Sequence, residues 1–157
     1  LIYDIDKRVN VDSKEIGVVM MNENFLNQNP ISAFHEDNAF QFFDKIFYAS
    51  DFSDRNLIGV SGTFTSVGSM YLNQSKYNED EIDKIDISYE SIHYLYENLK
   101  LLTIPQIINS YPSLDPKRAA TITSGLFLVI NLLKKYEINQ LKVSKSDILE
   151  GLILKYF

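Results

Sequence analysis

Alternating and continuous apolar runs near the start of the chain predict β-strands. Residues 1–6 alternate apolar and polar side chains, and residues 9–11 alternate again after the pair Lys7-Arg8. Alternation of this kind predicts half-buried strands, here joined by a tight turn. Residues 16–21 form a continuous apolar run with a β-branched centre, which is typical of a strand buried on both faces.

Apolar residues recur at helical spacing over most of the remaining chain. Residues that commonly cap helices precede several of these runs: Ser32, Ser88, Asp115 followed by Pro116, and Ser144 in a Ser-x-x-Asp pattern. We expect a further helix after the turn at residues 61–63 and a short one over residues 104–109, and the helix after Asp115 should be the longest. The expected buried positions are Ala39, Phe42, Phe43, Ile46, Phe47, Phe64, Val67, Met70, Ile92, Leu95, Tyr96, Leu99, Ala119, Ile122, Leu126, Val129, Ile130, Leu133, Ile148, Leu152 and Ile153.

Two more short strands, at residues 57–60 and 141–143, complete the pattern. Together the segments predict an α/β fold with one mixed five-stranded sheet and helices on both faces. The first three strands should be antiparallel and the last two parallel. The acidic segment 77–86 should be solvated. Because the chain contains no repeat, low-complexity tract or Pro/Gly-rich linker, residues 1–157 are expected to form a single domain.

Composition narrows the classes of function. The chain has 15 Lys and Arg against 21 Asp and Glu, a net charge of −6, so nucleic acids and anionic membranes, which require a basic surface, are not expected as partners. Because there is no cysteine, a disulfide scaffold, a thiol nucleophile and a thiolate zinc site are excluded, which agrees with a cytoplasmic protein. No apolar stretch reaches the roughly 18 residues of a membrane span.

The turn Ser61-Gly62-Thr63 is the strongest local candidate for chemistry, since it joins the strand at residues 57–60 to the following helix. Such a turn leaves free backbone N–H groups and a positive dipole at the helix N-terminus, where a phosphate can bind. Gly62 would admit a phosphate close to the backbone, and either hydroxyl could add a hydrogen bond. The turn lacks a Walker A lysine and a full G-x-G-x-x-G pattern, so an ordinary capped glycine turn is the alternative.

Arg118 is the second candidate. It follows Lys117 in the first turn of the helix expected after Asp115, where the helix dipole disfavours cations. Two basic residues at this place imply a compensating anion, which is either a carboxylate of the protein or a bound ligand. An ordinary surface salt bridge explains Arg118 equally well.

These patterns assign no catalytic residue and no metal ligand. His35 and His93 form no H-x-x-x-H pair, and the acidic run at residues 79–86 lacks the glycine and the spacing of a calcium loop. Asp4 and Asp6 share one face of a strand and could hold a cation, but a solvated hairpin explains them as well. No Ser, His and Asp set can be assembled.

Four motifs, in order, resemble the C-terminal part of the Ppx/GppA phosphatases, a family of exopolyphosphatases and guanosine pentaphosphate phosphohydrolases. They are similar to the family's Ser-Leu-x-Ile-Gly-Ala-Val segment, its strand and Gly-Gly-Thr turn, its Arg-Ala-Asp-x-Ile-x-x-Gly-Leu helix, and its closing Val-Ser and Arg-Glu-Gly-Leu signature. In this chain the motifs stand at residues 13–25, 58–63, 112–126 and 143–152. The resemblance therefore covers nearly the whole chain.

The resemblance implies a ribonuclease H-like, actin-type domain, the second domain of a longer chain, which faces a first domain across a cleft. There the family hydrolyses polyphosphate or guanosine tetra- and pentaphosphate with Mg²⁺. Its catalytic glutamate and its Asp-x-Gly-Gly-Gly-Ser phosphate loop lie upstream of the matched part, so the chain alone should be non-catalytic. Ser61, Gly62, Thr63 and Arg118 would contact phosphate or nucleotide. The expected partners are this ligand and the N-terminal domain of the same chain, and a homodimer is left open.

Three positions depart from the family pattern. Ser61 replaces the first glycine of Gly-Gly-Thr, Ala120 stands where the family usually has Asp, and Leu149 stands where it usually has Arg. Losing that Asp and Arg removes polar groups near the cleft, so the fold can persist while ligand handling changes. The alternative function is therefore a nucleotide-sensing or partner-binding module of the same fold that has lost catalysis.

Overall fold

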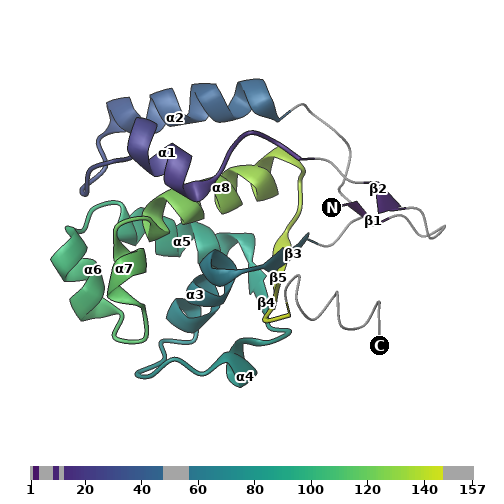
Figure 1. The fold of residues 1–157 in the computed structure, drawn as a ribbon, viewed down its shortest axis with the longest axis vertical. Helices are drawn as coiled ribbons and strands as arrows, with labels where there is room; N and C mark the ends of the chain where they lie inside the picture. The colour runs from purple at the N-terminus through teal and green to yellow at the C-terminus, as the bar shows by residue number, and fades with distance from the viewer. Residues whose placement is uncertain (1, 4–8, 11–12, 48–56, 147–157) are drawn as a thin grey trace.

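The computed structural model describes residues 2–3, 9–10, 13–47 and 57–146, which form an α/β fold (Figure 1). The strands are β1 (Ile2–Tyr3), β2 (Val9–Asn10), β3 (Leu57–Val60), β4 (Asp86–Ser88) and β5 (Gln140–Ser144). The helices are α1 (Val18–Asn24), α2 (Ala33–Ile46), α3 (Gly62–Tyr71), α4 (Glu79–Ile82), α5 (Tyr89–Leu99), α6 (Ile104–Ser110), α7 (Pro116–Ala119) and α8 (Ile122–Lys135).

The main sheet contains three described strands in the order β3-β5-β4. β3 runs parallel to β5, with Gly59 opposite Val143, and β4 runs antiparallel to β5. β1 and β2 pair antiparallel in a separate two-stranded sheet. The prediction of one five-stranded sheet is therefore wrong for the described residues. The mixed pairing, the parallel β3-β5 pair and the antiparallel hairpin are confirmed.

β3 is an edge strand of the described sheet, and its two faces differ. Gly59 faces α3, where a Cβ atom added at Gly59 would lie 2.1 Å from the Phe64 ring. Ile58 and Val60 point to the opposite face and are 57% and 44% exposed. The strand is therefore packed closely against α3 on one face and open on the other.

The third expected strand is instead a helix. Residues 18–24 form α1, whose N-cap residue is Gly17. Only Met21 of α1 is buried, and Val19 is 61% exposed, so the run is not buried on two faces. A short apolar run does not distinguish a strand from a helix by its periodicity. Packing decides here, since α1 lies against α8 rather than joining the sheet.

The acidic segment 77–86 contains a short helix, α4, and the start of a short strand, β4, neither of which was predicted. α4 exposes Glu79, Asp80 and Glu81 but buries Ile82 completely, and β4 buries Ile87. The prediction of a solvated segment is therefore right for the carboxylates and wrong for these two isoleucines. A strand of three residues is too short to show a clear alternation, so β4 was not expected.

The helix expected after Asp115 is split into α7 and α8. Asp115 caps α7 as predicted, but α7 ends at Ala119 and α8 begins at Ile122. Thr121 donates to the carbonyl of Arg118 through both its N–H and its hydroxyl, at 3.0 and 3.3 Å, which closes a tight turn in place of a continuous helix. α8 has 14 residues, as many as α2, so the prediction of one longest helix is wrong.

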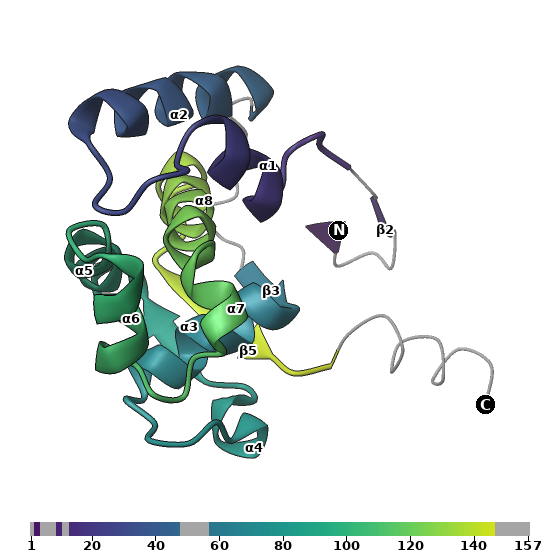
Figure 2. The ribbon, with the colours of Figure 1, turned by 60° about the vertical axis from the view of Figure 1, so that its left-hand side comes forward.

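α8 is the central helix of the fold. It contacts α1, α2, α3, α5 and α7, and α1 and α2 lie on the other side of it from α3 and the main sheet (Figure 2). The buried positions expected on α5 and α8 are confirmed, and of those expected on α2 only Ala39 and Phe43 are fully buried. The confirmed positions of α5 and α8 are Ile92, Leu95, Tyr96, Leu99, Ile122, Leu126, Val129, Ile130 and Leu133.

Several helix boundaries follow the predicted caps. Ser32 and Ser88 accept hydrogen bonds from backbone N–H groups in the first turns of α2 and α5, and α6 ends before Pro112. The helix expected after Ser144, which would carry Leu149, lies outside the described residues. Within the described ranges, no helix is long and apolar enough to cross a membrane.

Candidate functional site

The turn at Ser61 joins β3 to α3 through a strained backbone. Ser61 has φ 87° and ψ 173°, a region that residues with a side chain rarely adopt. Its carbonyl accepts hydrogen bonds from the N–H groups of Phe64 and Thr65, and no side chain caps the helix. At the positive end of α3, the N–H groups of Gly62 and Thr63 therefore have no hydrogen-bond acceptor among the described residues.

Arg118 lies against this turn. Its Nη1 atom donates hydrogen bonds to the carbonyl of Gly62 and to Oγ of Ser66, the latter at 2.9 Å. A Cβ atom added at Gly62 would lie 2.2 Å from Nη2 of Arg118, so the guanidinium occupies the space that a side chain would need. The structure thus brings Arg118 to the predicted Ser61-Gly62-Thr63 turn, while binding of an anion there stays a prediction.

Arg118 does not stand in the first turn of a long helix, where the sequence predicted it. α7 is only four residues long, so Arg118 stands in its last turn and is not opposed by the dipole of a long helix. The hydrogen bonds of Arg118 go to Gly62 and Ser66, and no carboxylate among the described residues pairs with it. Of the two compensating anions considered, the described part of the chain therefore does not provide the carboxylate.

Thr63 places the start of α3 against α8. A Cβ atom added at Gly125 would lie 2.6 Å from Cγ2 of Thr63 and 3.7 Å from Cγ2 of Val18. Gly125, near the start of α8, therefore allows the first turns of α1, α3 and α8 to meet. Thr121, the N-cap residue of α8, makes no capping hydrogen bond, as Ser61 makes none for α3.

The described helices differ in whether a side chain caps the N-terminus. α2, α4, α5 and α7 each begin with a residue whose side chain accepts a hydrogen bond from a backbone N–H of the first turn. α1, α3, α6 and α8 have no such hydrogen bond. Uncapped N-termini expose N–H donors that are otherwise satisfied within the protein. Of these, α3 and α8 begin beside Arg118, and because the first turn of α8 is buried, α3 is the one whose N-terminus can meet a ligand.

Ser66 belongs to this site and was not predicted from the sequence. Its side chain is buried, with 4% of the residue exposed, and it contacts Arg118 from one helical turn beyond Gly62. The i, i+4 spacing from Gly62 puts both residues on one face of α3, and that spacing was the available signal. Serine is common in helices without such a role, so the spacing alone would not have singled it out.

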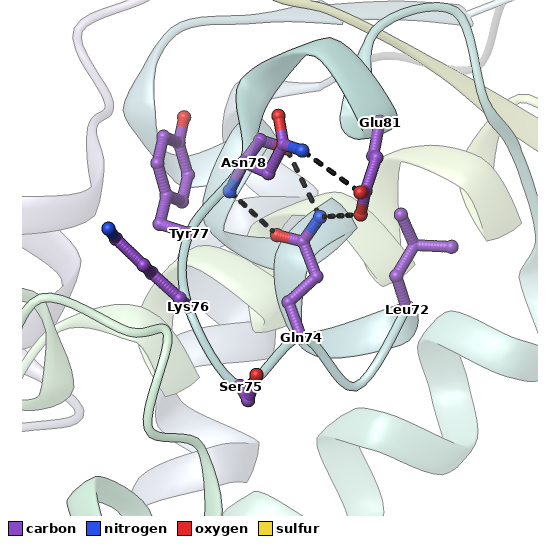
Figure 3. Close-up of a pocket in the computed structure, with 7 residues that line it drawn as sticks. All are labelled: Leu72, Gln74, Ser75, Lys76, Tyr77, Asn78 and Glu81. Atoms are coloured by element: carbon purple, nitrogen blue, oxygen red, sulfur yellow. Dashed lines mark hydrogen bonds between the residues drawn. The ribbon is translucent and has the colours of Figure 1, made fainter.

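A shallow pocket lies at the other end of α3. It is lined by Leu72, Gln74, Ser75, Lys76, Tyr77, Asn78 and Glu81 (Figure 3). The Gln74 amide bridges the backbone of Asn78, at 3.1 Å, and the carboxylate of Glu81, at 2.8 Å, and the Asn78 amide donates to Glu81 at 2.9 Å. These polar groups satisfy one another and hold α4 to the end of α3. The pocket is therefore separate from the Arg118 site.

The histidines take structural positions. Nδ1 of His35 lies 2.6 Å from Oγ of Ser32 and 2.7 Å from Nε2 of Gln28, and His93 lies 4.0 Å from Glu97 on α5. Across the residues that the structure describes, no group of three or more His, Asp and Glu side chains could hold a metal ion. The charged group of the Arg118 site is the guanidinium, which lies at the N-terminus of α3.

A family model described as the Ppx/GppA phosphatase family matches residues 1–157. Among curated proteins, the chain is similar to the bifunctional 3-dehydroquinate synthase/phosphatase of Fusobacterium nucleatum, with 27% identity over 157 residues. That match covers 96% of this chain and 23% of the relative.

Among solved structures, the chain is similar to a PPX-GPPA enzyme of Aquifex aeolicus, with a TM-score of 0.86, 22% identity and coverage of 93% of this chain and 49% of that chain. It is also similar to an exopolyphosphatase from Cytophaga hutchinsonii, with a TM-score of 0.74, 20% identity and coverage of 90% and 47%. At these identities the likeness shows the fold. The chain spans about half the length of both structures.

Proposed function

Because this chain belongs to the Ppx/GppA phosphatase family, we propose that it lines the phosphate- or nucleotide-binding cleft of a phosphoanhydride hydrolase. In the proposed protein the substrate is polyphosphate or a guanosine penta- or tetraphosphate. The chain supplies the turn at Ser61, Gly62 and Thr63 together with Arg118 as phosphate contacts. A first domain of the same protein completes the cleft and carries the catalytic groups.

The observation that carries the proposal is the contact of Arg118 with the uncapped start of α3. A guanidinium and a helix N-terminus both favour negative charge, and here they lie side by side. A phosphate oxygen placed between them would receive N–H donors from the turn and from Arg118. Such donors stabilise charge on a phosphate without taking part in proton transfer.

The chain's own residues bind and orient the phosphate. Mg²⁺ would neutralise phosphate charge in such an enzyme, and among the described residues no group of three or more His, Asp and Glu side chains is placed to hold a metal ion. We therefore assign no metal ligand and no catalytic step to this part of the protein. The 157 residues alone should release no phosphate.

The test measures phosphate release and ligand binding in the intact protein with Mg²⁺. Arg118→Ala should weaken binding of polyphosphate or guanosine pentaphosphate by about 10- to 100-fold, the range for a charged hydrogen bond. The matched control is Lys117→Ala, which removes an exposed neighbouring charge and should change binding little. Equal effects of both variants would show a general charge effect and overturn the assignment of Arg118.

A different pair of results favours the alternative function. Should the intact protein bind guanosine pentaphosphate through Arg118 yet release no phosphate, the chain belongs to a nucleotide-sensing module. The isolated 157 residues could instead hydrolyse either substrate, with the activity lost on mutation of a residue in this chain. That result would overturn the proposal that the catalytic groups lie in the first domain.

A further inference from the structure

Ser66 holds one nitrogen of Arg118. Its buried hydroxyl accepts a hydrogen bond from Nη1 at 2.9 Å, and the carbonyl of Gly62 accepts a second one from the same nitrogen. Both acceptors lie on α3, one turn apart. The guanidinium is therefore fixed to the helix by two bonds, both made through Nη1.

The remaining donors form the edge that suits a phosphate. A guanidinium carries five N–H donors, of which Nη1 has two, and both are engaged by Gly62 and Ser66. The three donors on Nε and Nη2 lie in one plane, and no residue of the described ranges accepts a hydrogen bond from them. This edge matches the spacing of two oxygen atoms on one phosphate group, which is how arginine binds phosphate in a bidentate manner.

We propose that Ser66 is a positioning residue that orients Arg118, so that the Nε–Nη2 edge is offered to two oxygens of one phosphate group. This inference rests on the proposed function. Arg118 is an exposed residue with a long flexible side chain, and the two bonds to α3 restrict its conformations before any ligand arrives. Ser66 itself is buried beneath the guanidinium and does not touch the phosphate.

Ser69 provides a matched control. It is the next fully buried serine of α3 and donates a hydrogen bond to Oγ of Ser113 at 2.5 Å. Ser69 connects α3 to Ser113, just before α7, and Ser66 connects α3 to Arg118, within α7. It makes no contact with Arg118, so Ser69→Ala removes a comparable hydrogen bond without releasing the guanidinium.

The experiment measures binding of tripolyphosphate to the intact protein by calorimetry. Ser66→Ala should weaken binding about fivefold, because ordering a released flexible side chain on binding costs about this much, and Ser69→Ala should leave binding unchanged. In the Arg118→Ala background, Ser66→Ala should have no further effect, because a positioning residue acts only through the residue it positions. Should Ser66→Ala fail to fold, Ser66→Cys replaces it in the double-mutant cycle, because the thiol keeps the size of the side chain and accepts a hydrogen bond only weakly.

The outcomes separate this inference from the proposed function. Normal binding by Ser66→Ala, with weak binding by Arg118→Ala, overturns the role of Ser66 and leaves Arg118 as a phosphate contact. An equal loss in Ser69→Ala, or a loss in Ser66→Ala that persists without Arg118, shows a structural effect on α3 and also overturns it. Normal binding by Arg118→Ala overturns both proposals.

Discussion

The guanidinium of Arg118 occupies the position where a side chain at Gly62 would begin. The two residues are 56 positions apart in the chain, and their contact joins the start of α3 to α7. Because the Gly62 backbone is helical, glycine is needed here for the space above it rather than for its backbone freedom.

Gly62→Ala should therefore weaken phosphate binding while leaving stability nearly unchanged. The new methyl group meets only the far end of an exposed, flexible side chain, which can move away at little cost. Gly68→Ala is the contrasting variant, since its methyl group would lie 2.5 Å from Cγ2 of the buried Ile82. That variant should lower the free energy of unfolding by about 1–3 kcal/mol and keep binding. Urea unfolding and calorimetry measure the two effects, and the reverse pattern would contradict the packing described.

Ser61→Gly should stabilise the protein. Ser61 has φ 87° and ψ 173°, where a Cβ atom is strained and glycine is not. Relief of this strain should raise the free energy of unfolding by about 1 kcal/mol, less the added flexibility of the unfolded chain. Ser61→Ala keeps the Cβ atom and should give no gain. A gain in Ser61→Ala equal to that in Ser61→Gly would show that the hydroxyl, and not the backbone, is unfavourable.

Tyr96 joins α5 to α2 through a carboxylate. Its buried hydroxyl donates to Oε1 of Glu36 at 2.8 Å, and Nζ of Lys100 lies 3.1 Å from Oε2 of the same residue. Tyr96→Phe should lower the free energy of unfolding by about 1.5 kcal/mol, the lower end for a hydrogen bond to a charged group, because Glu36 keeps Lys100. Tyr94→Phe, at a residue 72% exposed, is the matched control and should change little. A loss of the same size in both variants would contradict the assignment.

The contacts of Tyr96 and Lys100 with Glu36 should make the free energy of unfolding decrease at alkaline pH. Burial, and then the hydrogen bond to Glu36, raise the pKa of Tyr96 above its ordinary value of 10.0. Burial by itself lowers the pKa of Lys100, but hydrogen bonds to Glu97 and Glu36 outweigh it, so this pKa also stands above its ordinary value of 10.5.

Above about pH 10 the unfolded chain loses protons that the folded protein keeps, so the free energy of unfolding decreases as the pH rises. Below that pH the contribution is complete. Urea unfolding between about pH 8 and 11 should show this decrease, with a shallower slope in Tyr96→Phe. An identical slope in wild type and variant would exclude Tyr96 as its source.

The sequence predicted elements where one strong periodicity met a clear cap. Ser88 and the spacing of Ile92, Leu95 and Leu99 defined α5, because a single stripe of apolar residues fits only a helix packed on one side. The prediction of a strand over residues 16–21 was wrong because a short apolar run fits a strand or a helix equally well. Contact with α8 decides for the helix. Local periodicity does not indicate which distant segments contact each other. The order of the strands in the sheet was mispredicted for the same reason.

Most residues of the candidate site were predicted from the sequence, but the hydrogen bonds between them were not. Gly62 and Thr63 followed from the strand-to-helix turn, and Arg118 was selected by its charge for a reason that the short α7 does not support. Ser66 carries no charge and no motif, so only its distance to Arg118 singles it out.

The exposed face of β3, and its place at the edge of the described sheet, have a consequence for handling the protein. Among the described residues, β3 has one neighbour in the sheet, and Ile58 and Val60 are exposed on it. An uncovered edge strand with apolar side chains pairs readily with the same strand of another molecule. Ile58→Lys should therefore lower any self-association that arises at this edge, measured by light scattering as the concentration rises, without altering the Arg118 site.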